Sequence, residues 1–174
     1  IIHNKNTKTI EYRDAWLEIL GLPVAYTPYL SHPDPTVKRQ SGLLAPSFGH
    51  SSDLGFVAKV PYYINIDPTR DATLTALITG DGGSGAIGEY RQRFRNGTFD
   101  ATASLIGGDD DEDFRGHIKS EGRFDIDGTW RAGFDINRAS DDTYLSFYRI
   151  NSKDTLTTRP YIEGINGRNY ASGN

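Results

Sequence analysis

The 174-residue sequence contains no cysteine and no methionine. Without cysteine there is no disulfide framework, and the redox compartment cannot be inferred from cysteine usage. No stretch approaches the ~18 consecutive apolar residues of a membrane-spanning helix, which argues against a helical membrane protein. Helical periodicity is nearly absent, so a helical bundle is not expected either. The net charge of −4 does not fit a basic nucleic-acid-binding protein.

The first five residues lack the basic and apolar regions of a secretion signal. If the protein is exported, we expect its leader to lie upstream of this sequence. What the sequence does have is many aromatic residues, with ten Tyr, eight Phe and two Trp, and nineteen Gly. A transmembrane β-barrel remains compatible with this composition, because its alternating strands give a low average hydropathy.

Polar and apolar residues alternate over most of the chain after residue 70, and the clearest run is 114–126. Its polar positions are Arg115, His117, Lys119, Glu121, Arg123 and Asp125, and its other positions are Gly116, Ile118, Ser120, Gly122, Phe124 and Ile126. Side chains alternate across a strand, so this spacing predicts one strand with a charged face and an apolar face. Runs 86–95, 98–106 and 130–137 repeat the pattern.

Turn signals separate these runs. Asn96-Gly97 and Asp127-Gly128 predict two-residue hairpin turns of type I′, in which both central residues need a positive φ. Longer loops are expected at 80–85, 107–113 and 139–142. The sequence therefore predicts an up-and-down antiparallel meander from 71 to about 165, with short turns at one end and long loops at the other.

The first thirty residues have a different pattern. Segments 9–12, 15–19 and 22–26 read as short strands separated by turns, and they fit the last rungs of a separate β-structure. Ser31-His32-Pro33-Asp34-Pro35 then predicts an extended linker, because proline restricts its neighbours and breaks strands. We expect a domain boundary here, with a linker over 31–41.

A soluble β-sandwich and a membrane β-barrel both contain alternating strands. Three features favour the barrel: long charged side chains fill one face of neighbouring strands, short turns and long loops fall at opposite ends, and the strands are long. Runs of 10–13 residues suit a tilted membrane strand of ~9–11 residues and exceed the usual ~5–6. Roughly eight or nine strands are expected, and because open edges are costly in lipid, we expect a fragment of a larger barrel.

Three motifs in segment 21–75 follow one another in a specific order. They are P-V-A-Y-T-P-Y at 23–29, K-R-Q-S-G-L-L-A-P at 38–46 and P-Y-Y-I-N-I-D-P-T-R-D-A-T at 61–73. Together they resemble the LPS-assembly proteins of the LptD family, also known as OstA or organic-solvent-tolerance proteins. Ile64 and Asp67 depart from the family pattern, which has Trp and Ala at these two positions.

The resemblance implies a fold class and a function. The fold would be all-β: residues 1–30 would end a periplasmic OstA-type jellyroll, and residues 42–174 would form the first strands of an outer-membrane barrel. The family receives lipopolysaccharide from a periplasmic bridge of Lpt proteins and releases it sideways into the outer leaflet. It uses no cofactor, catalyses no reaction and holds an LptE-type lipoprotein plug inside the barrel. No nucleic-acid partner is expected, and outer-membrane lipids would surround the barrel.

The barrel interpretation assigns residues to two environments. Facing the lumen we expect Glu89, Arg91, Arg93, Arg115, His117, Lys119, Glu121, Arg123 and Asp125. Facing lipid we expect Ile118, Phe124, Ile126, Trp130 and Phe134. Pro46 and Pro61 lie in the candidate strands 42–49 and 54–66, where a proline cannot donate to the ladder. They mark either simple bends or, as the resemblance implies, a weakened seam that serves as a lateral gate.

No catalytic or metal-binding residue is predicted. His3, His32, His50 and His117 are scattered and lack metal-ligand spacing. The acidic run 109–113 lacks the spaced ligands of an EF-hand and reads as a solvated loop. The glycine-rich segment 81–85 lacks a lysine and a following helix, so it reads as a turn. Two alternatives stay open: another barrel of the porin type, or a soluble all-β carbohydrate-binding module.

Overall fold

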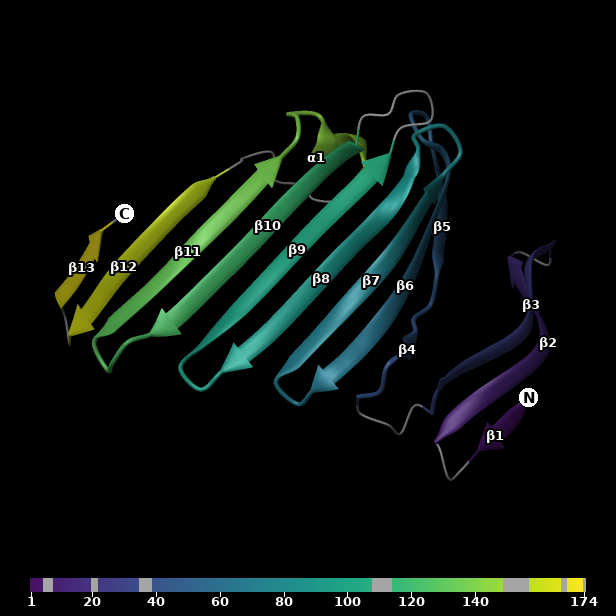
Figure 1. Cartoon of the computed structure of the whole chain (residues 1–174), viewed down its shortest axis with the longest axis horizontal. Coiled ribbons are helices and arrows are strands. Elements are labelled where there is room, and N and C mark those ends of the chain that lie inside the picture. The colour runs from purple at the N-terminus through teal and green to yellow at the C-terminus, as the bar shows by residue number, and fades with distance from the viewer. Residues whose placement is uncertain are drawn as a thin grey trace.

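The computed structural model of the chain describes residues 1–4, 8–19, 22–34, 39–107, 114–148, 157–166 and 169–173. Its strands form two separate antiparallel sheets (Figure 1). The smaller sheet has the order β1-β2-β3. It consists of β1 (Ile2–Asn4), β2 (Thr9–Ile19) and β3 (Leu22–Pro33).

The small sheet corrects two details of the predicted pattern. The expected strands 9–12 and 15–19 are one strand, β2, with a local distortion at Asp14, which has a φ of 50°. The Tyr26 hydroxyl of β3 donates a hydrogen bond to the Asp14 carboxylate at 2.7 Å. The third strand is also longer than expected, since β3 continues through 31–33, where the sequence predicts the start of the linker. Pro33 is tolerated there because β3 is an edge strand of the small sheet.

The larger sheet has ten strands, and those from β6 to β13 follow one another in sequence order. Their bounds are β4 (Gly42–Leu43), β5 (Ser47–Ser51), β6 (Gly55–Asp67), β7 (Arg70–Thr79), β8 (Ser84–Phe94), β9 (Gly97–Gly107), β10 (Phe114–Asp125), β11 (Trp130–Ala139), β12 (Thr158–Asn166) and β13 (Asn169–Gly173). The predicted up-and-down meander is confirmed. Within the described part of the chain the helix α1 (Tyr144–Phe147) has a single turn, and no helix there is long and apolar enough to cross a membrane.

Short turns and long connections fall at opposite ends of the sheet, as predicted. The turns after β6, β8 and β10 lie at the lower end in Figure 1, and α1 lies at the upper end. We call these the turn end and the loop end. Hairpins occur near both predicted turns, but the first turns at 95–96 instead of 96–97, and the second connection runs over 126–129. The expected type I′ geometry is wrong: among the described glycines, positive φ occurs at Gly55 and Gly83, both at the loop end.

The turns after β8 and β10 adopt other conformations, in which no residue has a positive φ. In the first turn, Phe94 pairs with Gly97, so the turn residues are Arg95 and Asn96. Asn96 also contacts the neighbouring strand: its carbonyl accepts from the Asp125 amide, and its side-chain amide donates to the Asp125 carbonyl. In the second, the Asp127 carboxylate accepts the amides of Thr129 and Trp130 at 2.7 and 2.8 Å. These two amides hold the pKa of Asp127 below its usual range.

Several glycines in the sheet lie directly opposite an aromatic ring. The pairs are Gly122 with Phe134, Gly133 with Tyr161, and Gly164 with Trp130. A Cβ atom built on any of these glycines would come closer than 3.0 Å to the opposing ring. The rings therefore occupy the space that a side chain would take, which is a known way to stabilise glycine within a sheet.

The hydrophobic core of the described residues lies at the loop end, where α1 packs on the sheet. The buried members are Leu54, Leu77, Ile106, Tyr144, Leu145 and Tyr148. Leu77 and Ile106 point to the same face as the polar positions Thr75 of β7 and Ser104 of β9, two residues away on each strand, so this core sits on the charged face of the sheet. The opposite face has no layer packed against it among the described residues and leaves its large apolar side chains exposed.

Candidate functional site

The charged face of β8, β9 and β10 is organised in rows that cross the strands. The backbone register places Glu89, Thr102 and Lys119 in one row. The next rows toward the turn end are Arg91, Asp100 and Glu121, followed by Arg93, Thr98 and Arg123. The residues predicted to face a lumen therefore share one face, because positions two apart on a strand point the same way.

Ion pairs connect neighbouring strands across this face. Arg131 of β11 reaches Asp125 of β10 at 2.7 Å and Glu163 of β12 at 3.6 Å. Arg159 of β12 reaches Asp135 of β11 at 3.5 Å. Exposed pairs of this kind contribute little to stability, so their main effect is to hold a polar surface of mixed charge in place.

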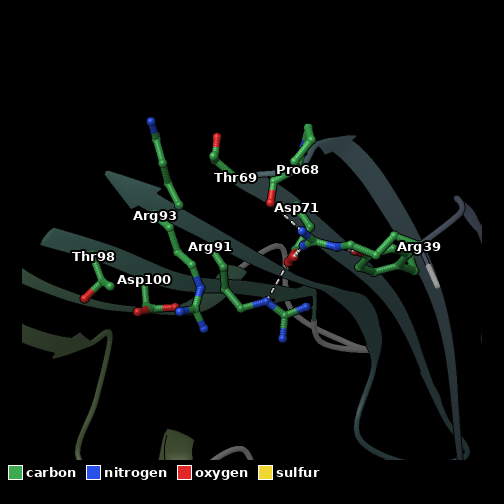
Figure 2. A pocket seen from close by; sticks show the side chains of 10 residues that line it. Arg39, Pro68, Thr69, Asp71, Arg91, Arg93, Thr98 and Asp100 are labelled. Carbon is green, nitrogen blue, oxygen red and sulfur yellow. Dashed lines mark hydrogen bonds and ion pairs between the residues drawn. The ribbon is translucent and has the colours of Figure 1, made fainter. Parts of the chain in front are cut away.

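A cavity of about 500 Å³ opens on the charged face at the turn end (Figure 2). Its lining residues are Arg39, Tyr63, Pro68, Thr69, Asp71, Arg91, Gln92, Arg93, Thr98 and Asp100. In Figure 2, Arg91 and Arg93 lie side by side, with Asp71 and Arg39 on one side and Asp100 on the other. Three arginines and two aspartates thus line a single hollow.

Asp71 of β7 holds two of these arginines. Its Oδ1 atom accepts from Nε of Arg91 at 2.6 Å, and its Oδ2 atom accepts from Nη2 of Arg39. Arg39 also donates to the Tyr63 hydroxyl at 3.3 Å and to the Pro68 carbonyl at 2.6 Å. These contacts fix Arg39, which follows the small sheet in the chain, to the turn end of the large sheet.

The opposite face of the sheet is apolar and exposed. Ile118 and Trp130, predicted to face lipid, are 49% and 41% exposed on this face, and Ile126 in the turn after β10 is 60% exposed. Further exposed apolar residues on the same face, beyond those predicted, include Tyr62, Ile64, Leu74, Ile78, Leu105 and Ile162. Phe99 lies between Tyr90 and Phe134, with ring centroids 6.1 and 6.3 Å apart.

At the loop end, the segment around α1 covers part of the charged face. The Tyr144 hydroxyl donates to Oγ of Ser104, and the Tyr148 hydroxyl donates to the Gly82 carbonyl, both at 2.8 Å. Arg115 makes two hydrogen bonds to Asp141, at 2.7 and 2.8 Å. Its guanidinium carbon also lies 5.5–5.6 Å from the ring centres of Tyr144, Phe147 and Tyr148. We call the segment 140–148 the loop cap.

The loop cap changes the environment of one predicted lumen residue. His117 lies on the charged face as expected, but it is only 6% exposed. The Tyr144 ring stacks beside it at 6.5 Å, and its Nε2 atom lies 3.1 Å from the Asn137 side-chain oxygen. His117 is therefore part of the packing under the loop cap and does not project into open water.

Pro46 and Pro61 both lie where the outer strands β4 and β5 pair with β6, and we call this pairing the seam. The expected strand 42–49 is split into β4 and β5, because Leu44, Ala45 and Pro46 lie opposite only two residues of β6. This is a β-bulge with one extra residue on the outer strand. The Pro61 carbonyl accepts a bond from the Leu44 amide, so the missing donor of Pro61 points at the same bulge.

The remaining candidate metal ligands are the histidines and the acidic run of the sequence. No group of three or more metal-ligating side chains occurs among residues the structure describes. The acidic run 109–113 lies outside those residues. His50 of β5 is exposed and pairs with Phe56 of β6. It lies on the apolar face, whereas His117 of β10 lies on the charged face, so the two do not form a common site.

The fold and site together define an all-β chain whose large sheet is an up-and-down meander with one charged face and one exposed apolar face. The sequence profile described as LPS transport system D, LptD, matches residues 113–174. The chain is 32% identical to the LPS-assembly protein LptD of Idiomarina loihiensis over 147 residues, which are 80% of this chain and 19% of that protein.

Two other relatives give the same result. The LPS-assembly protein LptD of Methylococcus capsulatus is 32% identical over 181 residues, covering 98% of this chain and 16% of that protein. The LptD of Pseudomonas aeruginosa is 33% identical over 164 residues, covering 84% and 18%. The chain therefore belongs to the LptD family, as its motifs predicted, and it spans about a fifth of the length of the curated relatives it matches.

Proposed function

We propose that the large sheet is part of the wall of an outer-membrane β-barrel, and that the chain takes part in inserting lipopolysaccharide into the outer leaflet. The observation that carries this proposal is the division of the sheet into an exposed apolar face and an ion-paired face. A large exposed apolar surface marks contact with a partner or a membrane. A barrel wall with lipid outside and water inside requires this division along every strand.

The strand dimensions support the same proposal. Strands β6 to β12 have 9–13 residues, close to the ~9–11 residues that a tilted strand needs to cross the hydrocarbon core. The turn end would then face the periplasm and the loop end the outside, because outer-membrane barrels have short periplasmic turns. The small sheet, as the end of a periplasmic jellyroll, would lie beside the turn end.

In this arrangement the cargo divides between the two faces. The acyl chains of lipopolysaccharide would travel in the membrane, and its sugars would pass along the charged face inside the barrel. Lipopolysaccharide would arrive from periplasmic Lpt bridge proteins, and a lipoprotein plug of the LptE type would occupy the lumen. None of these steps makes or breaks a covalent bond, so the chain acts in transport and not as an enzyme.

A lateral opening completes the proposal. Each ladder bond contributes a net ~0.5–1.5 kcal/mol, and the bulge with Pro46 and Pro61 interrupts the ladder between the outer strand and β6. Because both prolines affect the pairing of β4 and β5 with β6, this pairing is where we propose that the gate lies. A flexible outer strand would make sideways release of the lipid easier.

Spin labels test the two faces directly. In the complete protein folded in lipid vesicles, labels at Ile118 and Phe134 should be accessible to oxygen, which concentrates in lipid, and protected from a water-soluble nickel chelate. Labels at Glu121 and Arg123 should show the reverse. His117 is unsuitable as a water reporter because the loop cap buries it. Equal accessibility of the two faces to both probes would exclude a membrane wall.

A further inference from the structure

The cavity at the turn end carries more arginine donors than its own carboxylates use. Of the five N–H donors of Arg91, only the one on Nε has a partner among the described residues, the Asp71 carboxylate. The guanidinium of Arg93 has no hydrogen-bond partner within the same described residues, and Figure 2 shows it next to Asp100. The free N–H groups of both arginines therefore face the hollow.

Asp71 is a positioning residue in this arrangement. It is only 8% exposed, and both of its oxygens are occupied, one by Arg91 and one by Arg39. A carboxylate satisfied in this way orients the two guanidinium groups without filling the cavity. The three arginines outnumber the two aspartates of the lining, so the hollow has an excess of positive charge in a chain whose net charge is −4.

This combination suits a phosphate group. Guanidinium groups present paired donors that match phosphate oxygens, and charge-assisted bonds of this type are stronger than neutral ones. The volume of about 500 Å³ is large enough for a phosphorylated sugar. The hydroxyl of Thr98 lies on the cavity wall as an additional polar group.

We propose that Arg91 and Arg93 form a binding site for a sugar phosphate of the lipopolysaccharide cargo. The proposal rests on the function proposed above and names a contact that this cargo makes. The site lies at the turn end and includes Arg39, which follows the small sheet in the chain. A phosphorylated headgroup that leaves the small sheet would meet these arginines first on the charged face.

The test uses the complete protein in detergent and two glycolipids: lipid A with its phosphates and the same lipid after enzymatic dephosphorylation. The variant is Arg91→Gln/Arg93→Gln. The matched control is Arg131→Gln/Arg159→Gln, which removes two arginines from the same face outside the cavity. Circular dichroism verifies that each version is folded before its affinity for both lipids is measured.

Wild-type protein and the control should prefer the phosphorylated lipid, and the cavity variant should lose this preference. We expect the affinity of the cavity variant for the phosphorylated lipid to fall roughly 10- to 100-fold, as for removal of a hydrogen bond to a charged group. Affinity for the dephosphorylated lipid should stay unchanged in all three proteins. Millimolar inorganic phosphate should compete with the phosphorylated lipid in the wild type and the control only.

Four results would overturn the site. They are a preference retained by the cavity variant, an equal loss in the control, no preference in the wild type and, when phosphatidylglycerol is added as a third lipid, arginine-dependent binding as strong as that of lipid A. The last result would assign the site to ordinary phospholipids. A protein that binds neither glycolipid in any version would instead refute the proposed function, so the two failures are distinguishable.

Discussion

Arginine substitutions on the two faces of one strand compare, through their effect on stability, the environment of the apolar face with that of the charged face. Ala103 and Thr102 are adjacent near the middle of β9, and they point to opposite faces. Ala103 lies on the apolar face between Gly88 and Ile118, neither of which is charged. Thr102 lies on the charged face between Glu89 and Lys119. The pair Ala103→Arg and Thr102→Arg thus differs mainly in which face receives the charge.

The expected magnitude follows from the length of β9. Its eleven residues at ~3.4 Å each give a strand of ~37 Å, and a tilt of ~45° reduces its projection to ~26 Å, close to the ~25 Å apolar band of a barrel. Ala103 is one residue from the centre, so the arginine would lie near the bilayer midplane. We expect Ala103→Arg to lower the free energy of unfolding by ~2–4 kcal/mol.

Thr102→Arg should change the stability by less than about 0.5 kcal/mol, since Glu89 and Lys119 offset each other around the new charge. The assay is a urea titration of the complete protein folded in lipid vesicles, followed by tryptophan fluorescence. Changes of equal size at the two positions would refute the assignment of one face to lipid. A larger cost at Thr102 than at Ala103 would reverse the assignment.

Three further predictions concern the loop cap and the seam. Tyr144→Phe keeps the ring but removes one hydroxyl bond, so docking of the loop cap should weaken by about 0.5–1.5 kcal/mol, seen as faster amide exchange in α1; unchanged exchange would contradict the described packing. Arg115 holds the pKa of the Asp141 carboxyl well below its usual range, so this contact is complete above about pH 4 and is lost as the pH falls through the lowered pKa. The protection of the loop-cap amides, measured relative to their intrinsic exchange rates at each pH, should therefore fall only under acid conditions, and a fall near neutral pH would exclude this cause. Pro46→Ala/Pro61→Ala restores two backbone donors and should slow delivery of lipopolysaccharide to the outer leaflet at an unchanged folded level; normal delivery would leave the prolines as simple bends.

Alternation was sufficient to predict the strands and their two faces. The run 114–126 specifies its faces because six polar positions at a spacing of two fit only a strand, and β10 covers nearly this range. The turn geometry was not predictable from the Asn-Gly and Asp-Gly pairs alone. Asp127 accepts two backbone amides, and this local capping favours a longer loop in which no residue needs a positive φ.

The loop cap was missed, although the sequence contains a signal for it. Leu77 and Ile106 occupy polar-face positions, and they interrupt the polar alternation at the same end of two strands. The run Tyr144-Leu145-Ser146-Phe147-Tyr148 is apolar within a connection that should be hydrophilic. Apolar residues at the ends of polar faces together with an apolar loop indicate that the loop folds back onto the sheet.

The cavity could not have been found from the sequence. Arg39, Asp71 and Arg91 are separated by 32 and 20 positions in the chain, and each reads alone as an ordinary surface charge. Their contact depends on the register of β7 with β8 and on the path of the segment between the two sheets. The periodicity of a single strand specifies which face each side chain occupies, whereas the register also depends on the turn between the strands, and the position of Arg39 depends on tertiary contacts.

The glycine and aromatic pairs of the sheet have an evolutionary consequence. Phe134 fills the space over Gly122, and Trp130 fills the space over Gly164. A larger residue at the glycine would displace the ring, and a smaller residue at the ring would leave the glycine backbone uncovered. The two positions of each pair are therefore inherited as a unit, and among relatives a change at one should be accompanied by a change at the other.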